Sequence, residues 1–221
     1  MIQLHYSPGN ASLIVHLVLE EIGVPFELKL VDRARSAHKS APYLALNPNG
    51  LIPVLVDDGA RAAGAVPLVL YESAAICLHL ADTNPAAALL PALGSADRAH
   101  AYKWLVWCAS TLQSTINPYF YPERWAADDA GTAVVRSLAE AKVAPMLDQI
   151  DAELARHGGP WFLGERFSVV DPYAFVLCRW TRGFARPARE LAHIKPWLDR
   201  MLARPAVQRA FASEKLTAPF V

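Results

Sequence analysis

The first 82 residues alternate between two hydrophobic patterns, one with a period of two and one with helical spacing. The predicted elements are, in order, a strand over 2–6, a helix over 13–22, a strand over 26–30, a short helix over 42–46, a strand from 53, a strand over 67–71 and a helix opening at 72. Gly23 followed by Pro25 ends the first helix. A hairpin begins at Asp57 and is extended by the insert 60–65. The βαβαββα order predicts a parallel strand pair, then an antiparallel hairpin, covered by helices.

After residue 91 every further pattern is helical. The predicted helices cover 95–113, 132–156, 171–184, 194–201 and 205–212. We expect Pro118 and Pro122 to bend or end the first of these, and Pro145 to kink or divide the second. The sequence therefore predicts an α/β domain over 1–82, a linker over 83–91 and an all-helical domain over 92–221.

Composition narrows the class of protein. The chain has 221 residues, 53% of them hydrophobic, with 21 basic and 21 acidic side chains. This balance gives no sign of a nucleic-acid or membrane partner, and the N-terminus does not resemble a signal peptide. Cys77, Cys108 and Cys178 lie far apart in apolar helical segments, which favours buried reduced thiols over a disulfide or metal site. We expect a cytoplasmic protein.

The stretch NPNGLIPVLV at 47–56 is a turn that runs into an apolar strand. Pro53 occupies the first strand position, where its missing N–H is tolerated. A cis bond before Pro53 would turn the backbone of Ile52 outward, free to pair with an extended peptide as a sheet edge does. A trans proline in an ordinary strand-entry turn is the alternative.

Three segments together carry a family resemblance: YSPGNAS at 6–12, NPNGLIPVL at 47–55 and ESAAI at 72–76. In this order, with a helical half after them, they resemble the cytosolic glutathione transferases, whose N-terminal domain has the thioredoxin fold. The Ser-Pro-Gly start looks most like the bacterial beta class. A capping-box signature, Ser168 to Asp171, also matches the family and predicts a helix start there. The resemblance covers essentially the whole chain.

The resemblance implies that the turn before the first helix binds the thiol of glutathione. Here that turn offers Tyr6, Asn10 and Ser12 as donors. The beta class commonly has a cysteine where this chain has Ala11, so a mixed disulfide with glutathione at that position is not available. We favour Asn10 as the donor, with Ser12 as the alternative. Both side chains are also good helix caps, a role that can coexist with thiolate binding.

The resemblance assigns the remaining glutathione contacts. Glu72 and Ser73 suit the γ-glutamyl end, because a carboxylate meets an ammonium and a helix start meets a carboxylate. Ile52, held by Pro53, would pair with the cysteinyl residue. His38 and Lys39 are candidates for the glycyl carboxylate, with a solvated loop as the alternative.

The residues that would contact the electrophile are assigned less directly. The candidates are Trp104, Trp107, Gln113, Tyr119, Tyr121 and Trp180, any of which could instead be core. The beta class often has a histidine where Gln113 falls. Arg179, Arg182, Arg186 and Arg189 recur at helical spacing, which favours a solvated face over an anionic-substrate site.

We therefore predict a glutathione S-transferase that conjugates the thiolate of bound glutathione to small apolar electrophiles. A glutathione-dependent disulfide or peroxide reductase and a non-enzymatic binding module with the same fold are the alternatives. Glutathione would act as co-substrate, without a metal. The resemblance also implies a symmetric homodimer, with the helices that start at 72 and 95 at its interface. The sequence does not name the electrophile.

Overall fold

The computed structural model describes residues 1–61 and 66–221, and its internal contacts group the chain into two compact units. The first unit is Met1–Ala88 with Arg204–Thr217, and the second is Leu89–Ala203 with Ala218–Val221. The segment 204–217, expected in the helical domain, therefore groups with the first 88 residues. This grouping by contacts does not test the predicted domain ranges 1–82, 83–91 and 92–221, which therefore stay a prediction.

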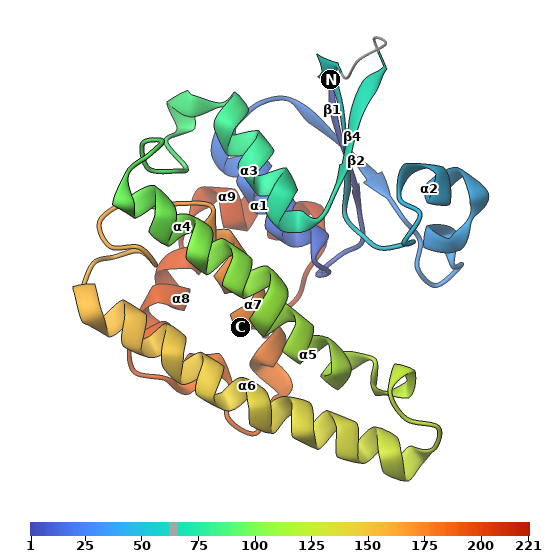
Figure 1. Cartoon of the computed structure of the whole chain (residues 1–221), viewed down its shortest axis with the longest axis vertical. Helices are drawn as coiled ribbons and strands as arrows, with labels where there is room; N and C mark the ends of the chain where they lie inside the picture. The colour runs from blue at the N-terminus through green and yellow to red at the C-terminus, as the bar shows by residue number, and fades with distance from the viewer. Residues whose placement is uncertain (62–65) are drawn as a thin grey trace. The chain divides into compact units, whose positions relative to one another are not determined.

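A single mixed sheet forms the centre of the first unit (Figure 1). Its strands are β1 (Ile2–Tyr6), β2 (Phe26–Leu30), β3 (Val54–Arg61) and β4 (Pro67–Tyr71), in the spatial order β2-β1-β3-β4. β1 pairs parallel with β2 and antiparallel with β3, and β3 pairs antiparallel with β4. The predicted βαβαββα order and thioredoxin-like fold are confirmed. Residues 62–65 of the expected hairpin insert lie outside the described residues.

Four α-helices accompany the sheet in the described part of this unit: α1 (Ser12–Ile22), α2 (Ala41–Leu46), α3 (Ser73–Thr83) and α9 (Pro205–Ser213). α1 contacts β1, α3 and α9. Because it is covered on several sides, every residue from Ser12 to Leu19 is buried, as expected of a helix that is apolar around most of its circumference. Its buried polar members, Ser12 and His16, therefore need partners within the protein.

The second unit is helical. It contains α4 (Ala96–Trp107), a π-helical turn (Cys108–Leu112), α5 (Gln113–Phe120), α6 (Asp129–His157), α7 (Val170–Trp180) and α8 (Ile194–Leu202). α6 runs undivided through Pro145, so of the two expected effects, a kink or a division, the division does not occur. α7 ends at Trp180, four residues before the predicted end, because Thr181–Gly183 tighten into a 3₁₀ turn. None of the helices described is long and apolar enough to cross a membrane.

The capping box at the start of α7 forms as predicted. The Ser168 N–H donates to Asp171 Oδ2 at 2.9 Å, and the Val170 N–H donates to Ser168 Oγ at 3.2 Å. Asp171 is fully buried, and its Oδ1 also accepts from the Phe162 N–H and from Trp197 Nε1. One carboxylate thus ties together the loop before α7, α7 itself and α8.

Candidate functional site

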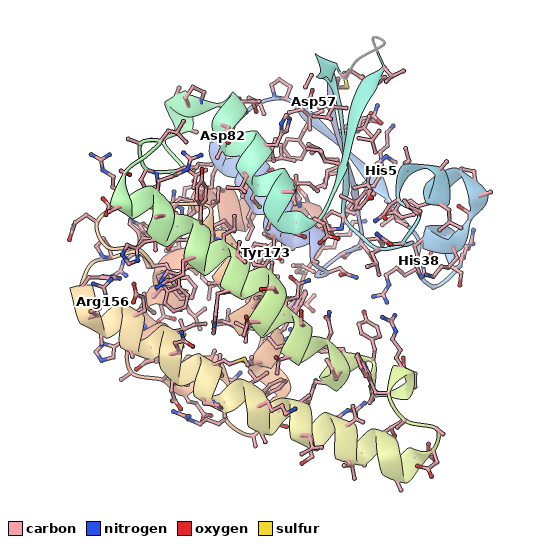
Figure 2. The ribbon with its side chains drawn as sticks, in the orientation of Figure 1. His5, His38, Asp57, Asp82, Arg156 and Tyr173 are labelled. Atoms are coloured by element: carbon pink, nitrogen blue, oxygen red, sulfur yellow. The ribbon has the colours of Figure 1, made fainter. Side chains whose placement is uncertain are left out.

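The sheet brings the three predicted glutathione-binding segments to one edge. β1 ends at Tyr6, and its His5, labelled in Figure 2, pairs with Val54, the first residue of β3. Val54 pairs in turn with Tyr71, the last residue of β4. The turn after β1, the turn before β3 and the junction of β4 with α3 therefore leave the sheet at the same edge.

The first turn is closed by the Ser12 side chain. The Ser7 N–H donates to Ser12 Oγ at 3.1 Å, and the Ser12 hydroxyl donates to the Ser7 carbonyl at 3.0 Å. Ser12 has no exposed surface. Its single hydroxyl proton is therefore engaged inside the turn, so the hydroxyl shapes the turn and has no second proton to offer a ligand.

Asn10, unlike Ser12, keeps a side-chain N–H group that could donate to a ligand. Its Oδ1 accepts from the Ala11 N–H at 2.6 Å, while its Nδ2 has no partner among the residues described. The side chain is half-buried. The Ser12 backbone N–H, at the first position of α1, also lacks a partner within the described ranges. Two N–H donors are thus available at the positive end of a buried helix, a place that favours an anion.

A hydrogen-bonded turn fixes the approach to β3. Asn47 is buried; its Nδ2 donates to the Leu51 carbonyl at 2.9 Å, and the Tyr43 hydroxyl donates to the same oxygen at 2.8 Å. The Ile52–Pro53 peptide bond is cis. The N–H and C=O of Ile52 have no hydrogen-bond partner in the described part of the chain. This backbone can therefore accept an extended peptide.

Gly50 brings Lys39 and His38 to this turn. Its φ of +61° is a left-handed conformation that glycine adopts without strain. A Cβ at this position would lie 2.9 Å from the His38 carbonyl oxygen and 2.9 Å from Lys39 Nζ. The short segment that carries His38, labelled in Figure 2, therefore packs directly on the turn before β3. The Lys39 side chain therefore lies beside Gly50, whereas His38 contributes its backbone carbonyl to this contact.

The junction of β4 and α3 carries backbone strain. Glu72 has φ +72° and ψ 108°, a conformation that costs a residue with a side chain about 1–3 kcal/mol. Its carbonyl accepts from the Ile76 N–H at 3.0 Å, so Glu72 is the N-cap residue at which α3 begins. Glu72 is exposed and Ser73 is buried at the first position of the helix. Strain of this kind concentrates at functional sites.

Tyr6 lies at the end of β1, and its hydroxyl has no partner in the described residues. Burial raises the pKa of its phenol, and the charge of Glu214 raises it further, so Tyr6 remains a protonated donor.

Glu214 contacts the first turn directly, and the sequence analysis did not predict this residue. Its distance of 205 positions from Gly9 excludes any local motif. An acidic residue at the end of the last predicted helix, where the helix dipole disfavours it, is the one signal available.

The aromatic candidates of the second unit fall into two groups. Trp104 is buried, with its ring centroid 5.1 Å from those of Trp107 and Phe162, so it belongs to the core. Tyr119 and Trp180 both pack on Phe120, with centroid distances of 5.2 and 6.1 Å. Tyr119, Phe120 and Trp180 form a partly exposed aromatic cluster on α5 and α7.

Two further candidates have polar contacts. Gln113, at the first position of α5, accepts a hydrogen bond at 2.7 Å from the hydroxyl of Tyr173, labelled in Figure 2. The Arg124 guanidinium lies over the Tyr121 ring, 4.2 Å from its centroid.

The four arginines predicted to share a solvated face, Arg179 to Arg189, are not all exposed. Arg179 is 4% exposed, because α7 is buried on all sides from Val170 to Arg179.

The three cysteines are buried, and burial raises the pKa of each thiol, that of Cys178 to about 12. Each is therefore held as a neutral thiol, which is a poor nucleophile. No cluster of three or more histidine, cysteine or acidic side chains suited to a metal ion occurs in the ranges 1–61 and 66–221.

Comparison with known proteins gives matches over both units. The family model described as "Glutathione S-transferase, N-terminal domain" matches residues 10–83, and that described as "Glutathione S-transferase, C-terminal domain" matches residues 107–205. The glutathione S-transferase GstA of Escherichia coli O157:H7 is 32% identical over 216 residues, which cover 97% of this chain and 99% of the relative.

Two other relatives bear on function. The disulfide-bond oxidoreductase YfcG of Escherichia coli K12 is 28% identical, over 98% of this chain and 97% of its own length. A glutathione transferase homologue from Sulfitobacter, whose crystal structure holds bound glutathione, has a TM-score of 0.85 and 28% identity. That match covers 98% of this chain and 99% of the Sulfitobacter chain.

Proposed function

This chain belongs to the glutathione S-transferase family, and from that premise we propose that it binds glutathione at the sheet edge and conjugates it, through its thiolate sulfur, to a small apolar electrophile. One observation carries the proposal. Three segments leave the sheet at the same edge, and each presents groups without a partner among the residues described: Asn10 Nδ2, the backbone of Ile52 and the start of α3.

The start of α1 would stabilise the thiolate. A free thiol titrates near ~8.5, so only a few per cent is ionised at neutral pH. Asn10 Nδ2 and the Ser12 N–H are donors without competing partners in the described chain, at the positive end of α1. Donors to the charged form lower a pKa, so they raise the fraction of thiolate. Proximity to a bound electrophile then favours attack by sulfur and departure of the leaving group.

The rest of the tripeptide would follow the sheet edge. The exposed Glu72 carboxylate would meet the γ-glutamyl ammonium, and the Ser73 hydroxyl with the first N–H groups of α3 would meet the α-carboxylate. The backbone N–H and C=O of Ile52 would pair with the cysteinyl residue as an added strand does. Lys39, whose Nζ lies beside Gly50 in the same turn, would meet the glycyl carboxylate.

Ala11 bears on the choice between conjugation and reduction. The beta class, which the first turn resembles, commonly carries a cysteine at this position. A chain with Ala11 cannot store glutathione there as a mixed disulfide, which favours direct attack by the bound thiolate. Reduction of a disulfide or peroxide by bound glutathione remains the second candidate, favoured by the relative named as a disulfide-bond oxidoreductase.

Among the predicted electrophile-binding residues, we favour Tyr119 and Trp180, which form an aromatic cluster with Phe120 within the second unit. These side chains combine apolar rings with partial exposure, whereas Trp104 is used in the core. Gln113 and Tyr121 offer polar groups nearby in the sequence of α5 and the turn after it. The particular electrophile is not specified by these residues.

The family further favours a homodimer in the cytoplasm that uses no metal. Exposed apolar side chains on α4, Tyr102 and Val106, suit an interface that includes this helix. Light scattering at micromolar concentration should give about twice the chain mass of 24.2 kDa. A mass near that of one chain would rule out a stable dimer.

Calorimetry with glutathione tests the binding site. We expect binding by the wild-type protein and a marked loss in Glu72→Ala, because the ligand ammonium would lose its carboxylate. Glu27→Ala is the matched control, since Glu27 is an exposed acid on β2 that pairs with Lys29 at 2.5 Å. No binding by the wild-type protein at millimolar glutathione would favour the non-enzymatic module.

An assay panel separates the two enzymatic candidates. Purified protein with glutathione is offered aryl halides, epoxides, hydroperoxides and hydroxyethyl disulfide. Turnover confined to the first two classes supports conjugation. Turnover confined to the last two would replace it by the reductase.

A further inference from the structure

A buried carboxylate links the C-terminal helix of the first unit to the first turn. Glu214 is the C-cap residue of α9 and is 3% exposed. Its Oε2 accepts from the Gly9 N–H at 2.7 Å, and its Oε1 lies 2.8 Å from His16 Nδ1. Both oxygens therefore have partners, one in the turn and one on α1. Figure 1 shows α9 in red beside α1 in blue.

The contact depends on the backbone at both ends. Gly9 has φ +67°, a left-handed conformation that favours glycine. At the other end, the Leu216 N–H donates to the Phe211 carbonyl and Lys215 adopts φ +54°. This is a Schellman-type helix end, which fixes the residue that precedes it. Gly9 immediately precedes Asn10, so the position of the Gly9 N–H sets the position of the Asn10 backbone.

Stability alone does not account for a carboxylate here. The C-terminal end of a helix disfavours negative charge, and burial disfavours it again. The free-energy cost of burying a carboxylate is large even when the carboxylate has partners. α9 is already fastened to α1 by exposed or half-buried pairs, Arg204 with Glu21 and Arg209 with Glu20. Of the three acids at the contact between α1 and α9, Glu214 is the one whose carboxylate accepts from the first turn.

We propose that Glu214 is a positioning residue for glutathione activation, which holds the Gly9–Asn10 backbone so that Asn10 Nδ2 and the Ser12 N–H point at the sulfur. The inference rests on the proposed function. His16 is the second contact of this carboxylate. Its Nε2 lies 3.8 Å from Glu20 Oε1, and its ring is 6.4 Å from that of Tyr6. Lys215, the next residue along, is exposed.

The charge and the position of Glu214 act on the thiol in opposite directions. A negative charge near the turn opposes ionisation of a neighbouring thiol, so removal of the charge alone lowers the pKa of that thiol. Loss of the hydrogen bond from Gly9 releases the turn and weakens the donors, which raises the pKa. A positioning role therefore predicts a rise, and a purely electrostatic role predicts a fall.

The experiment is a titration of thiolate absorbance in the glutathione complex against pH. Glu214→Ala should raise the pKa of the bound thiol by about one unit, which corresponds to an about tenfold lower thiolate fraction well below the pKa. Glu214→Gln should leave the pKa unchanged or lower it, because its amide oxygen still accepts from the Gly9 N–H and its NH₂ can donate to His16 Nδ1. Arg204→Ala is the matched control: it removes the pair between Arg204 on the α9 side and Glu21 of α1, and it should leave the titration unchanged.

The outcomes separate the two proposals. Absence of a thiolate titration in the wild-type complex contradicts the proposed function itself. A normal wild-type titration that Glu214→Ala leaves unchanged or lowers overturns the positioning role alone, as does an equal rise in Arg204→Ala. If Glu214→Ala does not fold, amide exchange of the wild-type protein decides: a slowly exchanging Gly9 N–H supports the inference, and one that exchanges as fast as a free amide overturns it.

Discussion

Asp171 and Glu214 are both buried carboxylates with both oxygens hydrogen-bonded, but they lie at opposite ends of their helices. Asp171 lies in the first turn of α7, where the helix dipole and free N–H groups favour an acid. Glu214 lies at the end of α9, where the dipole disfavours one. Asp171 serves the fold of the second unit, since its partners are backbone and core groups there. Glu214 contacts the turn that would activate glutathione.

The two acids also differ in whether their contacts can be predicted from neighbouring residues in the sequence. The partners of Asp171 include Ser168, three positions earlier, so a motif of four residues predicts this contact. The partners of Glu214 lie 198 and 205 positions away. An acid that breaks the local rule for helix ends, and is buried despite it, therefore indicates a contact made for a reason other than the stability of its own helix.

Removal of the Asp171 carboxylate should have the largest effect. In Asp171→Ala the Phe162 N–H, the Ser168 N–H and Trp197 Nε1 lose their acceptor inside the core. Each buried donor left unpaired costs about 1–3 kcal/mol, so the free energy of unfolding should fall by about 3 kcal/mol or more. Urea unfolding measures this loss. A change below ~1 kcal/mol would contradict the role assigned to Asp171, and an equally large loss in Glu214→Ala would erase the contrast between the two acids.

The pH dependence of stability should also distinguish Asp171. Burial raises its pKa from 3.8 to about 6, against the opposing effect of its hydrogen bonds. Between these values the folded state binds more protons than the unfolded state, so this group's contribution to stability is present below about pH 4 and is lost as pH rises through 6. At 1.36 kcal/mol per unit, the loss is about 3 kcal/mol.

Asp171→Asn removes this titration while it keeps the size and one acceptor of the side chain. The difference in unfolding free energy between Asp171→Asn and the wild-type protein should therefore shift in favour of the variant as pH rises from 4 to 7. Asp148→Asn is the control, because the Arg186 guanidinium lowers the pKa of Asp148 on the surface. Its effect should be small and opposite in sign. A parallel pH dependence of Asp171→Asn and wild type would contradict the assignment.

Asn10→Ala tests what the turn held by Glu214 supplies. One hydrogen bond to a charged group contributes ~1.5–3 kcal/mol, so its loss should raise the pKa of bound glutathione by about one to two units. Thiolate absorbance of the complex measures the shift. If Asn10→Ala leaves the titration unchanged and Ser12→Ala moves it, the turn that the Ser12 hydroxyl closes sets the pKa, and the Asn10 side chain does not. If neither moves it, the Ser12 backbone N–H or Tyr6 carries the effect.

Sequence patterns predicted the elements better than their packing. Alternation gave the strands of the sheet, and the Gly23 and Ser168 signals placed a helix end and a helix start. The pattern of α9 shows which of its positions are apolar but not which surface covers them, so its place beside α1 was not predicted. The same limit applies to Trp104, because the spacing of aromatic residues along a helix does not tell whether a given ring packs in the core or faces a ligand. The family resemblance placed candidates on the sheet edge that local patterns alone leave as caps and turns.

Replacement of the three cysteines should have the smallest effect on the site, and the thiol titrations depend on that result. Cys77 lies in α3, Cys108 in the π-helical turn and Cys178 in α7, and burial raises the pKa of each thiol. We expect the triple variant to Ala to keep the wild-type glutathione titration and its specific activity. Its stability should fall, because truncation of a buried side chain leaves a cavity. A lost thiolate signal in the folded variant would assign that signal to a protein cysteine, and the contrast between Glu214→Ala and Arg204→Ala would then report on a protein thiol.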